Sequence, residues 1–172
     1  MTEEALPMQR AVDFGLRRRY AIILGLCLAV LIVDQATKLW VEATLPLWSS
    51  QPVIPGFFDL CHVLNRGAAF GFLNGGDIGW QRWFFVGVAL LAMVVILFLA
   101  RTMDERKPLP YVGLGLIMGG AAGNLVDRVR LGLVIDFLDL YVGDWHWPAF
   151  NVADSAITVG AGLLVLTALR KD

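Results

Sequence analysis

Two aspartates lie among apolar residues, where a charged side chain is costly. Asp154 is near the start of the apolar segment 151–163, and Asp136 lies inside the apolar segment 133–138. An ionisable residue at membrane depth indicates a functional site. Two carboxylates in a poorly hydrated site share one proton, because both ionise together only with difficulty. Such a pair can activate water for amide hydrolysis without a metal or a covalent intermediate, although sequence spacing does not bring the two together.

The composition indicates an integral membrane protein. Of the 172 residues, 58% are hydrophobic and 17% are charged, and the mean hydropathy is +0.67. Soluble domains have roughly 45–50% apolar and ~25% charged residues. We expect a single membrane domain over residues 1–172. The net charge of -1 gives no electrostatic case for nucleic-acid binding.

The cysteines and histidines predict neither a disulfide nor a metal site. Cys27 lies in the middle of an apolar run and Cys61 in a polar connecting stretch, so we do not expect them to meet. Neither they nor His62 and His146 show the spacing of metal ligands. We therefore expect no metal and no cofactor.

Four stretches are long and apolar enough to cross a hydrocarbon core of ~30 Å. They cover residues 20–41, 83–100, 110–126 and 152–169. The first must include Asp34, because the charge-free run before it is too short to span the core at ~1.5 Å per residue.

The distribution of basic residues predicts the direction of the spans. Nine of the 14 Lys and Arg residues lie in the N-terminal tail, the loop between the second and third spans, or the C-terminus: Arg10, Arg17, Arg18, Arg19, Arg101, Arg106, Lys107, Arg170 and Lys171. We therefore expect both termini in the cytoplasm. The six Trp residues fall near the outward ends, as an interfacial aromatic belt would.

The outward-facing segments carry signals other than spans. Pro and Gly residues punctuate short β-prone runs in the segment 46–79, which predicts a small sheet at the membrane surface. The segment 127–150 is apolar enough to lie in the interface, and its secondary structure remains open.

Small and polar residues in the spans indicate how the helices pack and pair. Gly115, Gly119 and Gly123 form a face of the third span that allows close helix packing, which we expect to bring Asn124 beside Asp154. The order of Asp34 and Lys38 favours an ion pair on one helix. This pair either neutralises itself near the interface or also anchors neighbouring backbone around a site.

The residues beside the two aspartates are also ambiguous. Asn151 is a favoured N-cap for the helix that contains Asp154, so capping alone could explain that acid. No helix start requires Asp136. Asp127 and Arg128 are adjacent, so we expect each to contact a different partner.

Five motifs occur in one order over almost the whole chain. They are VDQATK (33–38), LNRGAAF (64–70), GNLVDR (123–128), VIDF (134–137) and FNVADS (150–155). Together they resemble the bacterial lipoprotein signal peptidase family (signal peptidase II). Leu64 and Arg66 depart from the residues common in that family, without affecting the two aspartates.

The resemblance implies an aspartic endopeptidase of the bacterial inner (plasma) membrane. It would cut the signal peptide from diacylglyceryl-modified prolipoproteins, just before the lipidated cysteine, with Asp136 and Asp154 as the catalytic dyad. It implies that seven further residues bind substrate or support the site: Asp34, Lys38, Asn65, Asn124, Asp127, Arg128 and Asn151.

The resemblance also implies a fold, namely a membrane α-helical protein with four transmembrane helices, a small extracytoplasmic β-sheet (cradle) and an interfacial helix. It places a helix in the region after Asp136. The expected partners are lipidated prolipoproteins and membrane lipid, and the expected state is a monomer whose active site lies near the outer face.

Two other functions compete with a peptidase. In a proton-coupled transporter, Asp34, Asp136 and Asp154 would form a proton relay, but the acids gather at one face and no inverted repeat indicates alternating access. A structural membrane subunit held by its glycine faces would leave Asp136 unexplained.

Overall fold

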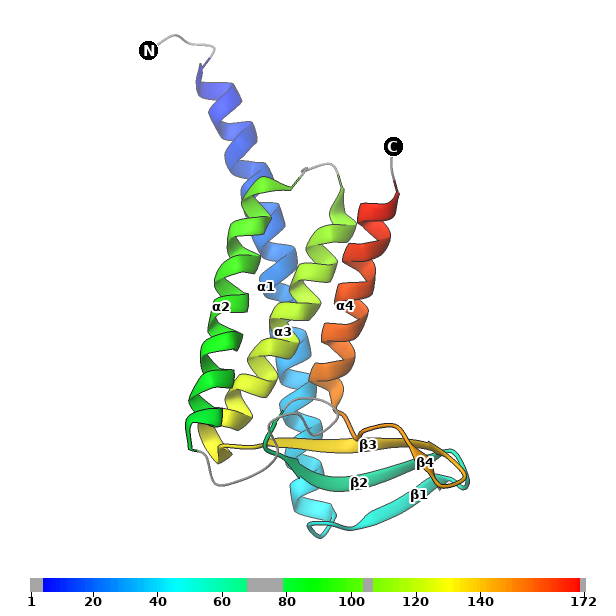
Figure 1. The fold of residues 1–172 in the computed structure, drawn as a ribbon. Coiled ribbons are helices and arrows are strands. Elements are labelled where there is room, and N and C mark those ends of the chain that lie inside the picture. Colours follow the sequence, from blue (N-terminus) through cyan, green and yellow to red (C-terminus); the bar gives the residue numbers. More distant parts are fainter. Residues whose placement is uncertain (1–4, 68–78, 104–106, 171–172) are drawn as a thin grey trace.

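The computed structural model describes residues 5–67, 79–103 and 107–170, with side chains from residue 17 onward. Within these ranges four long helices run side by side as a bundle (Figure 1), each long and apolar enough to cross a membrane. The four are α1 (Ala5–Thr44), α2 (Trp80–Thr102), α3 (Pro108–Leu131) and α4 (Val152–Leu169). The prediction of four spans is confirmed.

The helix α3 extends further than the sequence predicts. We expected it to end near residue 126, but it continues to Leu131 and stops at Gly132, whose φ of 77° is left-handed. Glycine adopts this conformation without a steric penalty, and its N–H bonds to the carbonyl of Arg128 at 3.0 Å. Asp127 and Arg128 therefore project from a helix and not from a loop.

The central helix of the bundle is α3, which packs against each of the other three (Figure 1). Its glycines form two separate contact faces. On the first face, a Cβ on Gly119 would lie only 2.7 Å from the Cβ of Val30 in α1. On the second face, a Cβ on Gly113 would lie 2.9 Å from the carbonyl oxygen of Gly160 in α4.

One expectation about these glycines needs correction. The face formed by Gly115, Gly119 and Gly123 packs mainly on α1, and Gly113 and Gly120 make the close approach to α4. The two sets differ because Gly113 and Gly120 are seven residues apart, so they lie on one side of the helix that the other three do not share. The outer ends of α3 and α4 nevertheless lie together, as expected.

A four-stranded antiparallel sheet lies across one end of the bundle and projects past α4 (Figure 1). Its strands, in spatial and chain order, are β1 (Ser50–Ile54), β2 (Phe58–Asn65), β3 (Val134–Val142) and β4 (Trp145–His146). The sheet predicted for the first outward segment is therefore present. Residues 68–78 of that segment, which include the end of the second motif, lie outside the described residues.

The expected helix after Asp136 is wrong, because this region forms β3. Strand β3 pairs with β2 from Val134 to Leu140, so its backbone groups are satisfied by the ladder. Its side chains Ile135 and Phe137 pack against Val41 and Leu45 at the end of α1. Pairing and packing thus favour a strand in an apolar stretch that local sequence left open. The described ranges contain no fifth helix.

Close packing of α3 against α4 gives a first test. The substitution Gly120→Ala should destabilise the bundle by about 1–3 kcal/mol, because the added Cβ would collide with the backbone carbonyl of Ala153. Chemical denaturation in mixed micelles measures the change. The control Gly87→Ala adds the same methyl group to α2, where nothing lies within 4 Å. Equal stability of the two variants would contradict the packing described.

Candidate active site

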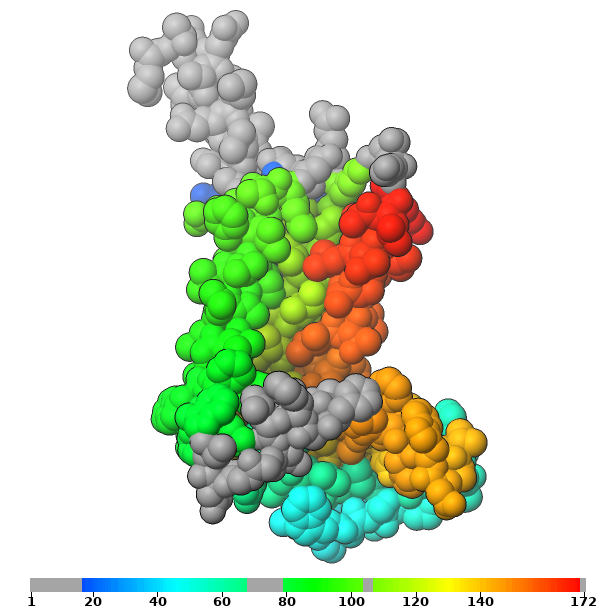
Figure 2. All heavy atoms as spheres, in the orientation of Figure 1, coloured from blue at the N-terminus to red at the C-terminus, as the bar shows by residue number. Residues whose placement is uncertain are grey.

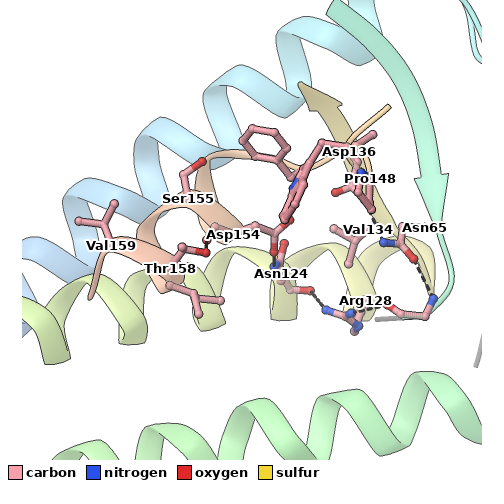
Figure 3. A pocket seen from close by; sticks show the side chains of 15 residues that line it. Asn65, Asn124, Arg128, Val134, Asp136, Pro148, Asp154, Ser155, Thr158 and Val159 are labelled. Carbon is pink, nitrogen blue, oxygen red and sulfur yellow. Dashed lines mark hydrogen bonds between the residues drawn. The ribbon is translucent and has the colours of Figure 1, made fainter. Parts of the chain in front are cut away.

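The two aspartates meet in one pocket at the sheet end of the bundle (Figure 3). Asp136 comes from β3 and Asp154 from the first turn of α4, and both line a cavity of about 490 Å³. Asp136 is 2% exposed and Asp154 is half-buried. The pairing that spacing alone could not establish is therefore present in the fold.

Two asparagine side chains link the carboxylates. Asn151 donates its side-chain N–H to Asp136 Oδ1 at 2.7 Å, and Asn124 donates to Asp154 Oδ1 at 2.8 Å. The two amides also meet, because Asn151 Nδ2 lies 3.3 Å from Asn124 Oδ1. Asn65 Nδ2 donates to the second oxygen of Asp136 at 3.0 Å. These donors fix the orientation of both acids.

Capping and site formation turn out to be combined in Asn151. Its side-chain oxygen accepts the backbone N–H of Asp154 at 2.9 Å, which makes it the N-cap of α4. Its side-chain nitrogen faces Asp136. The cap therefore sets the position of Asp154 on its helix relative to the strand that carries Asp136.

The surroundings of Asp136 favour its protonated form. The pKa of Asp136 is raised from 3.8 to about 7, mainly by burial. The negative charge of Asp154 contributes to the same increase. Hydrogen bonds from Asn65 and Asn151 and the charge of Lys38 act in the opposite direction. A carboxyl group with a pKa near neutrality can hold or release a proton under physiological conditions.

A buried ion network lies behind the dyad. The Lys38 ammonium is 1% exposed and lies 2.9 Å from Asp34 and 2.8 Å from Asp127, both fully buried. Asp34 accepts the backbone N–H of Ala153 at 2.9 Å. Asp127 accepts the backbone N–H of Ile135 at 3.2 Å. Each carboxylate thus holds the residue that precedes one member of the dyad.

This network decides between the two interpretations of Asp34 and Lys38. The pair is buried and also anchors the start of α4, so self-neutralisation at the interface does not describe it. Lys38 further donates to Asn124 Oδ1 at 3.0 Å, which connects the network to the dyad. The expectation of different partners for Asp127 and Arg128 is confirmed, since Arg128 donates to the carbonyl of Gly67.

Gln35 is a contributor that the sequence analysis did not assign. Its amide nitrogen lies 3.0 Å from Asp127, 3.2 Å from Asp34 and 3.2 Å from the carbonyl of Gly123. The residue lies inside the first motif, one position after Asp34, and that placement was the available signal. It donates to both carboxylates that also share the Lys38 ammonium.

The walls of the pocket differ on its two sides. Arg128 lines one side (Figure 3). Its guanidinium lies 4.7 Å from the centre of the Phe85 ring. The other side consists of Ile157, Thr158 and Val159 of α4, and Val159 is 56% exposed on the outer surface of the bundle. The segment 147–150 covers the pocket and was also not assigned from the sequence.

No group of three or more His, Cys, Asp or Glu side chains within the described ranges is arranged to hold a metal ion. Cys27 and Cys61 are both free thiols, as expected. Burial raises the pKa of Cys61 to about 12, with the charges of Asp139 and Asp136 adding to the effect. This thiol therefore remains protonated at neutral pH.

The fold and the site define a multi-pass membrane protein with a paired-carboxylate centre at one end of its helix bundle. A family model described as signal peptidase (SPase) II matches residues 26–170. The chain therefore belongs to the signal peptidase II family and is an enzyme, which argues against the transporter and the structural subunit.

Similar proteins agree with this assignment. The chain is 54% identical over 153 residues to a lipoprotein signal peptidase of Nitratidesulfovibrio vulgaris (strain DP4), covering 89% of this chain and 92% of the relative. It is 52% identical over 142 residues to one of Geobacter metallireducens, covering 83% and 86%. A solved structure of a bacterial membrane enzyme matches with a TM-score of 0.76 and 31% identity, covering 84% and 85%.

The raised pKa of Asp136 predicts a pH dependence of stability. The folded state holds this proton up to about pH 7, whereas the unfolded chain loses it near 3.8. The contribution of this proton to the free energy of unfolding is therefore complete below about pH 4 and is lost as the pH rises through 7. The free energy of unfolding in micelles should fall across this interval. The decline should be smaller in Asp136→Asn, and an unchanged slope would contradict the shift.

The buried network predicts a large effect of Lys38→Met. Removal of the ammonium leaves Asp34 and Asp127 buried without a cation, which should cost about 3–5 kcal/mol of unfolding free energy. The control Glu42→Gln removes one partner of the surface ion pair with Arg130 and should cost under about 1 kcal/mol. Denaturation of both variants in the same micelles checks the difference, and similar losses would count against the network.

Proposed function

We propose that this protein is the aspartic endopeptidase that removes the signal peptide from diacylglyceryl-modified prolipoproteins. It would cleave just before the lipidated cysteine, with a water molecule activated between Asp136 and Asp154. The observation that carries the proposal is the convergence of these two carboxylates on one pocket, joined through Asn124 and Asn151. The similar proteins named as lipoprotein signal peptidases support the choice of substrate.

In the proposed reaction the dyad shares one proton and titrates as a unit. The ionised carboxylate takes a proton from water while the water oxygen attacks the scissile carbonyl carbon. The protonated carboxyl group donates its proton to the carbonyl oxygen, which gives a neutral tetrahedral intermediate. Transfer of a proton to the nitrogen and cleavage of the C–N bond then release the amine, and one carboxyl group is again protonated.

The pocket walls support this assignment of roles. The amides of Asn65, Asn124 and Asn151 orient the acids, while Arg128 is the cation at the pocket surface. We propose that Arg128 binds carbonyl groups of the substrate backbone, since its contact with the Phe85 ring holds the guanidinium at the pocket. Holding the scissile peptide against a fixed dyad supplies proximity and orientation.

The position of the site along the bundle fits a substrate anchored in the membrane. Asp154 lies in the first turn of α4, where a span meets the sheet. We propose that this end faces outward from the inner membrane and that both termini are cytoplasmic. Arg17, Arg18 and Arg101 lie toward the opposite end, as basic cytoplasmic flanks do. Arg106 and Lys171 lie outside the described residues.

We also propose that one chain in contact with membrane lipid is the active unit. Both carboxylates, the linking amides and the Lys38 network come from the same chain. Large apolar side chains such as Trp83, Leu91 and Phe98 are more than 60% exposed along α2, as expected for a lipid-facing surface.

Substitution of the dyad tests the proposed function. Asp136→Asn and Asp154→Asn should each lower kcat for a lipidated prolipoprotein at least about 1,000-fold, because the amide can neither take nor give the shared proton. The variants should insert and retain the helix content of the parent. The control Asp144→Asn changes an exposed carboxylate in the β3–β4 turn and should retain activity. Turnover near the parent level in either dyad variant would contradict the proposed mechanism.

A further inference from the structure

A second cavity lies beside the catalytic pocket on the sheet. Its volume is about 380 Å³, and it shares the segment 147–149 with the catalytic pocket. Trp48 forms its rim, Cys61 and Val63 contribute from β2, and Asp139 and His146 contribute from β3 and β4. Figure 2 shows the β3–β4 hairpin and the segment that follows it (orange) against the strands β1 and β2 (cyan).

The two cavities follow one face of β2. Cys61 and Val63 line the second cavity and Asn65 lines the catalytic pocket, so alternate residues of a single strand face pass from one to the other. The strand register places Val63 directly opposite Asp136. At ~3.3 Å per residue, the path from Asn65 to Cys61 is about 13 Å, the length of four extended residues.

The catalytic pocket has a second side, which gives this path a direction. Ile157, Thr158 and Val159 lead from Asp154 along the lipid-facing surface of α4. This exposed, largely apolar side suits an apolar signal peptide. The chain beyond the scissile bond must then leave by the other side, along the sheet and away from the bundle.

We propose that the second cavity is a binding groove for the residues that follow the lipidated cysteine, an extended polypeptide segment of the substrate. This inference rests on the proposed function. The groove would receive about the third to the sixth residue after the scissile bond, and it would make the enzyme selective for this part of the substrate.

The charges in the groove predict which segments it accepts. The Asp139 carboxylate has its side chain 17% exposed, with His146 Nδ1 at 2.9 Å. The register places a second carboxylate, Asp59, directly opposite Asp139, just outside the residues that line the cavity. Among the described residues that line the cavity, none is Lys or Arg. The groove therefore favours neutral or basic residues and disfavours acidic ones.

The rim carries a strained aromatic residue. Trp48 has a φ of 64°, a left-handed conformation that costs a non-glycine residue roughly 1–2 kcal/mol. Hydrogen bonds of the neighbouring backbone hold it there, with Trp48 N–H donating to His62 O and His62 N–H donating to Ser49 O. Trp48 is 67% exposed and lines the cavity. Strain that presents an aromatic side chain to a groove is typical of a binding surface.

Cleavage of a matched substrate series tests the groove. The substrates are lipidated prolipoprotein peptides with one signal sequence and one lipobox. One ends two residues after the scissile bond, and three others extend to eight residues with a neutral, a basic or an acidic segment at positions three to six. For the parent enzyme, kcat/KM should be at least about fivefold higher for the neutral extended peptide than for the short one. The acidic peptide should lose at least about fivefold relative to the neutral one.

Two variants test whether the groove causes these differences in kcat/KM. Asp139→Asn should abolish most of the discrimination between acidic and neutral peptides, since it removes a charge and keeps an oxygen that can face His146. Trp48→Gly should lower kcat/KM for the extended peptides and leave the short peptide unaffected. Glycine adopts positive φ freely, so the thermal stability of this variant should be retained. The control Asp144→Asn changes an exposed carboxylate of the same hairpin outside the groove lining and should keep the parent discrimination.

The outcomes separate this inference from the proposed function. Equal kcat/KM for short and extended peptides would overturn the groove and leave the peptidase intact. Discrimination that survives Asp139→Asn would likewise overturn the assignment of the groove. Failure of the parent enzyme to cleave any lipidated peptide would overturn the proposed function, and the groove with it.

Discussion

The positions of Asp136 and Asp154 depend on one buried ammonium group. Lys38 lies between Asp34 and Asp127, and each of these acids accepts a backbone N–H from the residue just before one member of the dyad. The strand that carries Asp136 and the helix that carries Asp154 are thereby held by the same ion network. Since Ile135 and Ala153 are held by charged acceptors, the separation of the Asp136 and Asp154 side chains is set by backbone contacts and not by their own flexibility.

Such a network is costly, and its composition limits the cost. Two carboxylates and one ammonium carry a net negative charge in a region with almost no solvent, and burial of an incompletely paired charge is strongly unfavourable. Amide groups reduce the imbalance, because Gln35 donates between the two acids and Asn124 accepts from Lys38. An apolar replacement of the network could be as stable, but it would supply no directional bonds to the backbone. Geometry at the dyad is therefore the physical reason for these charges.

The sequence predicted the elements better than their contacts. The four spans and the sheet were foreseen because hydrophobic length and turn residues are local signals. The pairing of Asp136 with Asp154 was foreseen only through the resemblance of the motifs to the family, because sequence spacing does not bring the two residues together. The strand after Asp136 was missed, because its stability comes from pairing with β2 and from packing on α1, which no local pattern records. The same limit applies to Gln35, whose role depends on two acids separated by 93 residues in the chain. The assignment of glycine faces to particular neighbours also requires the bundle itself.

The position of Asp136 and Asp154 where a span meets the sheet gives the sheet a role in the proposed function. Under the proposed function, an apolar segment of the substrate would approach Asp154 along α4, and the chain beyond the scissile bond would need backbone partners outside the membrane. The antiparallel sheet provides a surface of alternating side chains at that level, with Asp136 as a member of its third strand. Under the proposed function, one carboxylate on a strand and a second one on a span would let a single pocket hold a peptide that crosses from lipid to water.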